Sequence, residues 1–427
     1  MPAATYPASS LDQPLATVDP EVARILARER RRLQTQLQLI PSENYASRAV
    51  MEATGSVMTD KYAEGYGDKR YYNGCGEVDA VEQLAIARAK KLFGCDHVNV
   101  QVYSGAIANT AAYMALIAPG DTILAMDLNH GGHLTHGMSL NYSGITYKAV
   151  HYGVEVDTGR LDYGKIAALA RQHRPKMLVC GASAYPRTID FEAFARIAKD
   201  VGAFLLADIS HIAGLVVTGL HPSPVALADV VMTTTHKTLR GPRSAILMCK
   251  QQHAKAIDRA VFPGLQSGPH MHQVAAKAVG LLEASRADFV DYARRVVENS
   301  KALAGALIEK GFKLVSGGTD NHLCLVDLTP TGVTGRDAAN RLEEAGIVVN
   351  KNTVPGETRS PQVTSGIRPA APAVTSRGMG PAEMRITAEW IHQVVTHDDP
   401  ALRESIKGEV ADLCSQFPIY ADLGGHP

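Results

Sequence analysis

Three stretches of this sequence place polar residues directly after apolar runs of the kind that form buried strands. They are Ser104-Gly105-Ala106, Asp208 and Lys237. Small residues that open a helix let backbone N–H groups approach an anion such as a phosphate. A carboxylate at a strand end caps a helix or pairs with a cationic heterocycle nitrogen. A lysine beside a buried strand end is desolvated, which favours the neutral amine that attacks a carbonyl carbon to form an imine.

Each of these features has an ordinary structural explanation when it is taken alone: a strand–helix turn, a helix cap and a solvated lysine. Together, and in this order along one chain, they supply what pyridoxal phosphate requires. That cofactor needs an anchored phosphate, a carboxylate partner for its pyridinium nitrogen and a lysine that bonds to its aldehyde. The combination therefore predicts a pyridoxal-phosphate site.

A competing interpretation comes from the run Asn-His-Gly-Gly-His-Leu-Thr-His at 129–136. His130, His133 and His136 recur at a spacing of three, which on a helix face could bind a metal ion. Gly131 and Gly132 disfavour a helix there, and no matching set of carboxylates stands out. We therefore expect no metal site, and expect one of these flat imidazoles to stack on a planar cofactor.

The elements that must position these residues follow from an alternation of helical and strand-like stretches after residue 77. Amphipathic stretches such as 77–93 and 191–200 alternate with apolar runs. This alternation requires crossover connections, so it predicts a mainly parallel sheet with helices on both faces. Ligands bind beyond the carboxyl ends of such strands, where the polar residues above fall. The expected strands are 98–102, 122–125, 176–180, 204–207 and 230–233.

Three parts of the chain are expected. Residues 1–60 form an N-terminal arm and helix at a dimer interface, 61–288 a large cofactor-binding domain, and 289–427 a small C-terminal α/β domain. Residues 1–17 are polar with three prolines and predict a loose arm, and Asp19-Pro20-Glu21 predicts the start of a helix. The small domain is expected to contain helices at 286–309, 335–345 and from 381, and strands at 313–316, 323–328 and 347–349.

The composition narrows the class of protein. The 427 residues carry 43 Lys+Arg and 43 Asp+Glu, so a zero net charge argues against a strongly electrostatic nucleic-acid binder. The uncharged run 97–120 is too polar to span a membrane, and the start of the chain lacks a secretory signal pattern. Six scattered cysteines without a C-x-x-C pair argue against disulfides. A soluble cytoplasmic protein is predicted, with RNA binding by the arginine-rich helix at 24–32 as an alternative.

Several long stretches resemble the serine (glycine) hydroxymethyltransferase family over nearly the whole chain. The resemblance implies the pyridoxal-phosphate aspartate-aminotransferase-like fold (fold type I), an α/β fold with a large domain built on a mainly parallel mixed sheet and a smaller C-terminal α/β domain. The matching stretches are LIPSEN at 39–44, KYAEGY at 61–66, KRYY at 69–72, GGHLTHG at 131–137, TTTHKTLRGPR at 233–243, NHLCLVDL at 321–328 and VTSGIR at 363–368.

The resemblance also implies roles for individual residues. Pyridoxal 5'-phosphate would be held covalently on Lys237, with tetrahydrofolate as co-substrate. Implied catalytic residues are Lys237, Glu64, His133, Asp208, Tyr72 and His211. Implied cofactor-binding residues are Ser104, Gly105, Ala106, His133, Ser183, Asp208, His211, His236, Lys237 and Gly268. Implied amino-acid-binding residues are Ser42, Tyr62, Glu64, Tyr72 and Arg368, and implied folate-binding residues are Leu128, Gly132, Leu134 and Asn352.

The implied reaction is reversible transfer of the serine hydroxymethyl group to tetrahydrofolate, giving glycine and methylenetetrahydrofolate. Because Tyr62, Glu64, Tyr72 and Gly268 would come from the neighbouring subunit, a homodimer with shared sites, or a tetramer, is expected. The residues Asp68, Tyr103, Ser210, Ser267 and His270 depart from the family pattern. They leave two alternatives: an α-methylserine hydroxymethyltransferase that yields D-alanine, and a folate-independent aldolase or transaldolase of β-hydroxy amino acids.

Overall fold

A seven-stranded sheet forms the centre of the larger part of the molecule in the computed structural model, which describes residues 11–421. The strand order is β4-β10-β9-β8-β7-β5-β6. All neighbours are parallel except at β10, which runs antiparallel to both β4 and β9. The strands are β4 (His97–Asn99), β5 (Thr122–Met126), β6 (Lys148–Tyr152), β7 (Met177–Cys180), β8 (Phe204–Asp208), β9 (Val230–Thr234) and β10 (Ala245–Cys249).

Alternate residues of each strand enter two separate cores, because successive side chains point to opposite faces of a sheet. On β8, Leu205 and Ala207 face one core and Leu206 the other. The first face is covered by α4 (Gly76–Phe93), α7 (Tyr163–His173), α8 (Phe191–Val201) and α11 (Met271–Ala284); the second by α5 (Gly105–Leu116) and α10 (Ala254–Arg259). The predicted mainly parallel sheet with helices on both faces is confirmed.

A second unit contains a four-stranded antiparallel sheet in the order β11-β12-β15-β14. Helix α12 (Ala287–Glu309) joins the two units: Phe289 and Val296 pack in the large core, and Leu303 and Leu307 in the small one. The other elements are β11 (Lys313–Leu314), β12 (Val326–Asp327), β14 (Asn350–Asn352), β15 (Gly366–Arg368), α13 (Gly335–Glu344), α14 (Pro372–Ser376), α15 (Pro381–Thr396) and α16 (Pro400–Gln416).

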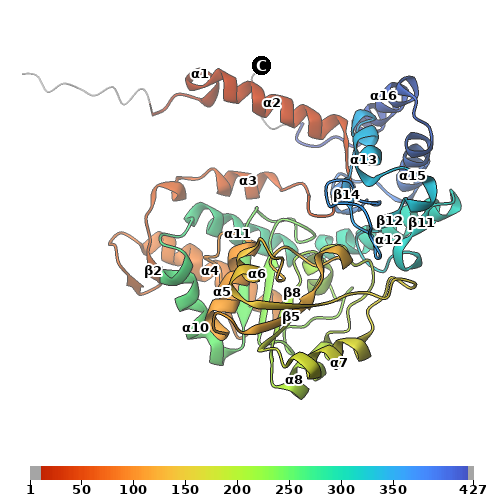
Figure 1. Ribbon diagram of the computed structural model, residues 1–427. Helices are drawn as coiled ribbons and strands as arrows, with labels where there is room; N and C mark the ends of the chain where they lie inside the picture. The colour runs from red at the N-terminus through yellow and green to blue at the C-terminus, as the bar shows by residue number, and fades with distance from the viewer. Residues whose placement is uncertain (1–10, 422–427) are drawn as a thin grey trace, which may run out of the picture.

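The N-terminal segment starts with α1 (Leu15–Val18) and α2 (Pro20–Thr35). The side chain of Asp19 accepts a hydrogen bond from Val22 N at 2.9 Å, which confirms the predicted helix start. Figure 1 shows α2 standing away from the large sheet, and its C-terminal end contacts α16. β1 (Leu37–Gln38) then pairs with β13 (Ile347–Val348) of the small unit. Of the predicted loose arm, residues 1–10 lie outside the described part of the chain.

Several short elements complete the described part of the chain. They are α3 (Arg48–Thr54), the β2 (Gly65–Tyr66) and β3 (Lys69–Arg70) hairpin, α6 (Tyr142–Thr146) and α9 (Ala213–Val217). Among the described residues, no helix has the length and apolar character needed to cross a membrane.

The backbone between β4 and α5 pairs with side chains instead of another strand. Lys277 Nζ, buried on α11, donates to the carbonyls of Val100 at 2.5 Å and Val102 at 3.0 Å. Gln266 accepts from Tyr103 N at 2.9 Å. The predicted strand 98–102 therefore ends at residue 99, and these side chains set the place where α5 begins.

Substituting Lys277→Met should change how stability depends on pH. Burial lowers the pKa of Lys277 to about 7, from an ordinary value of 10.5, although Glu82 opposes the shift. Between pH 7 and pH 10.5, Lys277 keeps its proton in the unfolded chain but has released it in the folded chain. The free energy of unfolding contributed by this group therefore rises with pH, by at most about 1.4 kcal/mol per pH unit. Urea unfolding across this window should show the rise in the wild type and its loss in K277M; parallel profiles would contradict it.

Candidate active site

A cavity of about 980 Å³ opens beyond the carboxyl ends of β7, β8 and β9, between the large sheet and the small unit. Residues from both units line it, which agrees with the rule that ligands bind at this edge of an α/β sheet. The sequence-predicted residues that the structure brings together here are Ser42, Ser104, Gly105, Ala106, Leu128, Gly132, His133, Leu134, Ser183, Asp208, His211, His236, Lys237, Asn352 and Arg368.

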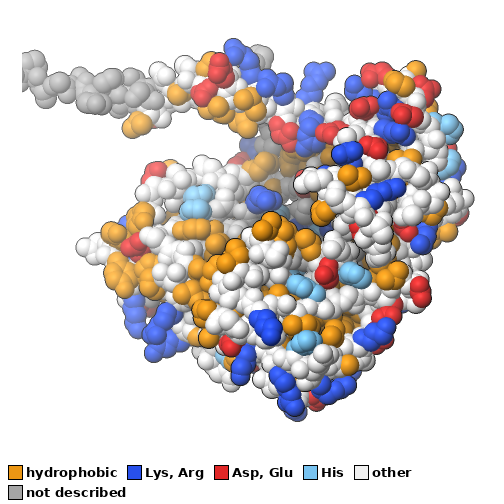
Figure 2. All heavy atoms as spheres, in the orientation of Figure 1, with side chains coloured by type: hydrophobic (Ala, Val, Ile, Leu, Met, Phe, Trp, Pro, Cys, Tyr) orange, Lys and Arg blue, Asp and Glu red, His pale blue; other side chains and the backbone are white. Residues whose placement is uncertain are grey.

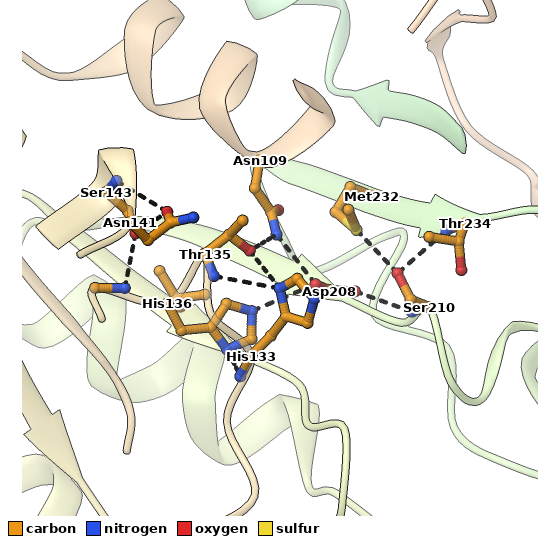
Figure 3. A network of polar contacts seen from close by, with 12 residues as sticks. Asn109, His133, Thr135, His136, Asn141, Ser143, Asp208, Ser210, Met232 and Thr234 are labelled. Atoms are coloured by element: carbon orange, nitrogen blue, oxygen red, sulfur yellow. Dashed lines mark hydrogen bonds and ion pairs between the residues drawn. The ribbon is translucent and has the colours of Figure 1, made fainter. Parts of the chain in front are cut away.

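Asp208, at the end of β8, is the one acidic side chain among the residues that line the cavity. Its carboxylate accepts hydrogen bonds from Ser210 N at 3.0 Å and Asn109 Nδ2 at 3.1 Å, and its Oδ2 lies 3.3 Å from His136 Nε2 (Figure 3). Burial by itself would raise the pKa of Asp208. The His136 contact and the nearby Lys237 hold the pKa well below its ordinary value, so this carboxylate stays ionised.

Lys237 follows β9 in a turn and is buried at the cavity wall. Burial lowers the pKa of Lys237 to about 8; Asp208 opposes the shift, and Arg368 and Arg243 add to it. The backbone carbonyl of Lys237 accepts a hydrogen bond from Asn44 Nδ2 at 2.9 Å. Asn44, in the LIPSEN stretch, therefore helps to hold the turn that carries Lys237. The lowered pKa makes the neutral amine of Lys237 accessible near neutral pH.

The N-terminus of α5 forms a cradle that fits a phosphate. Ser104 caps the helix, and Ser104, Gly105 and Ala106 line the cavity. The first N–H groups of a helix lack intrahelical acceptors and bind anions. A Cβ added at Gly105 would lie 2.8 Å from the Thr234 side chain, so the cradle needs glycine there. Thr234 Oγ1 is buried and has no hydrogen-bond partner among the described residues, which suits an additional ligand oxygen.

The three histidines of the 129–136 run have separate partners. His130 Nδ1 accepts from Val154 N at 3.1 Å, whereas His133 Nδ1 lies 2.7 Å from Thr135 Oγ1. His136 Nδ1 accepts from His133 N, so its Nε2 carries the proton that it shares with Asp208. Burial and His136 lower the pKa of His133 to about 4, so its ring is neutral and lies in the cavity wall. In the described part of the chain no group of three metal-ligating side chains gathers.

Arg368, on β15 of the small unit, reaches the same cavity. Its Nε donates to Asn350 Oδ1 at 3.2 Å, and its Nη1 donates to the carbonyl of Ser183. Burial lowers the pKa of Arg368 to about 10, which still leaves the guanidinium charged at neutral pH. A planar, oriented guanidinium in a cavity is suited to bind a carboxylate.

The remaining predicted residues form a second cluster, which is absent from the cavity lining. Tyr62 Oη lies 2.9 Å from Ser267 Oγ, which donates to Glu64, and the Tyr62 and Tyr72 rings meet edge to face at 5.4 Å. A Cβ added at Gly268 would lie 3.0 Å from the Tyr62 ring. Tyr62, Glu64, Tyr72 and Gly268 are thus brought together with each other but not with Lys237.

The buried guanidinium of Arg70 holds the backbone of the loop that carries Glu64. Arg70 Nη1 donates to the carbonyls of Ala63 at 2.9 Å and Gly65 at 2.6 Å, the residues on either side of Glu64. Arg70 is in turn paired with Asp79 at 2.8 Å and Glu82 at 3.2 Å. These contacts fix the backbone of the loop, although Tyr62 on it is exposed.

Several residues of the site were not predicted. Asn109 and Ser210 donate to Asp208, Thr234 faces the cradle, and His322 pairs with His211 at 3.2 Å. Thr234 and His322 lie in stretches that carry the family resemblance, so those stretches could have indicated them. For Asn109, inside a helix of small residues, no local pattern in the sequence points to a site.

The chain matches the family model of serine hydroxymethyltransferase over residues 15–391. A serine hydroxymethyltransferase of Acidothermus cellulolyticus is 56% identical over 411 residues, which cover 95% of this chain and 96% of that protein. One of Methanospirillum hungatei is 55% identical over 410 residues, covering 96% of this chain and 99% of that protein. As its sequence predicted, the chain belongs to the serine hydroxymethyltransferase family, pyridoxal-phosphate enzymes of fold type I that use tetrahydrofolate as co-substrate.

Proposed function

We propose that this chain transfers the hydroxymethyl group of serine reversibly to tetrahydrofolate, at a site that a second copy of the chain completes. The observation that carries the proposal is the joint presence of Lys237, Asp208 and Arg368 around one cavity. Both relatives are named serine hydroxymethyltransferase, which favours serine over the α-methylserine and aldolase alternatives.

The residues present fit pyridoxal phosphate. Ser104, Gly105 and Ala106 would hold its phosphate, Asp208 its ring nitrogen and His133 one face of its ring, and Lys237 would bond to its aldehyde carbon. When bound, this cofactor supplies an electrophilic carbonyl carbon and a ring that accepts electrons from a bond broken at the amino-acid α carbon. Ser183, His211 and His236 also line the cavity and would complete the cofactor's surroundings.

The chain's own groups would bind and orient the amino acid. Arg368 would pair with the substrate carboxylate and thereby fix which bond at the α carbon is presented for cleavage. Lys237, as a neutral amine, would accept or return a proton near that carbon. The ionised Asp208 would keep a proton on the heterocycle nitrogen. Ser42, which also lines the cavity, would contact the amino acid, and Leu128, Gly132, Leu134 and Asn352 would hold the pterin.

Glu64 would handle the proton of the substrate hydroxyl, with Tyr62 and Tyr72 beside it, from the partner subunit. Two observations support a shared site: these residues lie outside the cavity of their own chain, and the cluster is solvent-exposed. Tyr62 and Tyr72 are 53% and 46% exposed, and Tyr71 next to them is 74% exposed. Figure 2 shows apolar side chains gathered on this face, and such patches mark interfaces. We propose a homodimer as the smallest active unit.

The cysteines support a reducing compartment, and we propose that the enzyme acts in the cytoplasm. All six are free, and five of them are buried in the cores. Unpaired thiols of this kind are usual where glutathione and thioredoxin keep them reduced.

Turnover assays should establish the substrate. Serine should be converted to glycine only when tetrahydrofolate is present, whereas α-methylserine and threonine should react more slowly. Faster turnover of α-methylserine to D-alanine would replace the proposed substrate. Turnover of serine that does not depend on folate would support the aldolase alternative.

Borohydride reduction of the protein loaded with pyridoxal phosphate should place the cofactor on Lys237. Lys277 is an internal control, because burial also lowers its pKa, to about 7, yet its amine is enclosed in the core. Peptide mass spectrometry should find the label on Lys237 alone and none in Lys237→Ala. A label on Lys277, or on another lysine at equal yield, would refute the assignment.

Co-expression of Glu64→Gln and Lys237→Ala chains with different tags should restore activity. If Glu64 acts in the partner's site, each mixed dimer contains one site with both residues intact. Half of randomly assembled dimers are mixed, so the pool should recover about a quarter of the wild-type activity. Separately purified parents should remain inactive. A mixed dimer without activity would mean that both residues serve the same chain.

A further inference from the structure

Two buried histidines, His211 and His322, form a pair, and the mechanism above gives a place to His211 beside the cofactor but no role to His322. His211 follows β8 and lines the cavity, whereas His322 lies on the loop before β12, behind it. His211 Nδ1 is 3.2 Å from His322 Nε2, and the ring centroids are 5.4 Å apart. The backbone carbonyl of His322 accepts from Ala371 N at 3.0 Å, so its own position is fixed.

Both rings are neutral. Burial, followed by the charges of Lys237 and Arg368, lowers the pKa of His211 well below its ordinary value. Burial and the same two cations lower the pKa of His322 to about 3. The other titratable groups that face the pair, His133 and His221, are histidines and supply no negative charge. Each ring therefore carries one proton, and the hydrogen bond between them joins one N–H to one bare nitrogen.

The surroundings of His322 Nδ1, the ring nitrogen that does not face His211, determine which ring donates the hydrogen bond between them. His322 Nδ1 is buried and has no hydrogen-bond partner among the described residues. If His211 donated, His322 would carry its proton on Nδ1 and bury an unpaired N–H. If His322 donates from Nε2, the unpaired atom is a bare acceptor nitrogen. Unpaired N–H groups are the rarer of the two in protein interiors, so the second arrangement is favoured.

We propose that His322 is a positioning residue that donates to His211 Nδ1 and thereby keeps the proton of His211 on Nε2. In this tautomer His211 presents a hydrogen-bond donor to the cavity, beside the cations Lys237 and Arg368. It would donate to an anionic oxygen, either the substrate carboxylate or the cofactor's ring oxygen. That ligand assignment rests on the proposed function; the tautomer does not.

Long-range ¹H–¹⁵N spectra of the ¹⁵N-histidine-labelled holoenzyme test the tautomer directly. The His211 signals, assigned by their loss in His211→Asn, should show a protonated Nε2 and a bare Nδ1. His221 is an internal reference for the opposite tautomer, because its Nδ1 donates to Pro222 O at 3.0 Å and its Nε2 accepts from Ile189 N at 3.2 Å. A His211 pattern that matches His221 would overturn the proposal.

Two variants separate positioning from packing. His322→Gln keeps an N–H donor near Nε2 and should retain the His211 tautomer and a near-normal KM for serine. His322→Leu keeps the volume but removes the donor, and should raise that KM about ten-fold, with a smaller change in kcat. Equal effects of both variants on KM would contradict the inference. If H322L does not fold, the wild-type spectrum and H322Q still decide it. If the enzyme does not act on serine, the spectrum is unaffected, so the two failures can be told apart.

Discussion

The buried negative charge of Asp208 is the feature on which the rest of the site depends. An ionised carboxylate inside a protein is stable only when donors or cations surround it. β8 brings Asp208 to the cavity, while Asn109 arrives from α5 and His136 from the loop after β5. Because these elements meet only in the folded sheet, the charge and its donors are assembled together. The cavity is therefore electrostatically organised before any ligand binds.

Around that charge the cavity is electropositive although the chain is neutral overall. Lys237, Arg243, Lys351 and Arg368 line it, against the single carboxylate of Asp208. The proposed ligands carry phosphate and carboxylate groups, and local cations and helix N–H groups suffice to hold them. Burial lowers the pKa of both Lys237 and Arg368. The amine of Lys237, whose pKa falls to about 8, exchanges protons near neutral pH, whereas the guanidinium of Arg368 stays charged. The same buried cavity thus suits Lys237 to proton transfer and Arg368 to binding an anion.

Most of the large sheet could be predicted because its strands are short apolar runs bounded by turns. Strands β6 and β10 were not predicted. β6 contains the polar residues Lys148 and His151, and β10 follows the turn that carries Lys237 without an intervening helix, so neither fits the alternation of helices and apolar runs. The expected strand at 98–102 was too long, because Lys277 and Gln266 take the backbone partners that another strand would supply. These are tertiary contacts from residues more than 150 positions away, which no local pattern reports.

The sequence by itself determined which residue types could do chemistry, their order along the chain and, through long matching stretches, the family. Only the tertiary structure decided which contacts these residues make. Lys237, Asp208 and Arg368 line one cavity, whereas Glu64, Tyr62 and Gly268, which the resemblance already assigned to a neighbouring subunit, cluster outside it. The same holds for His322, whose partner His211 is 111 residues away in sequence. The physical reason is that apolar periodicity and motif spacing report only on neighbouring residues in the chain. Which donors reach a buried group depends on which helices, strands and loops pack together in the folded protein.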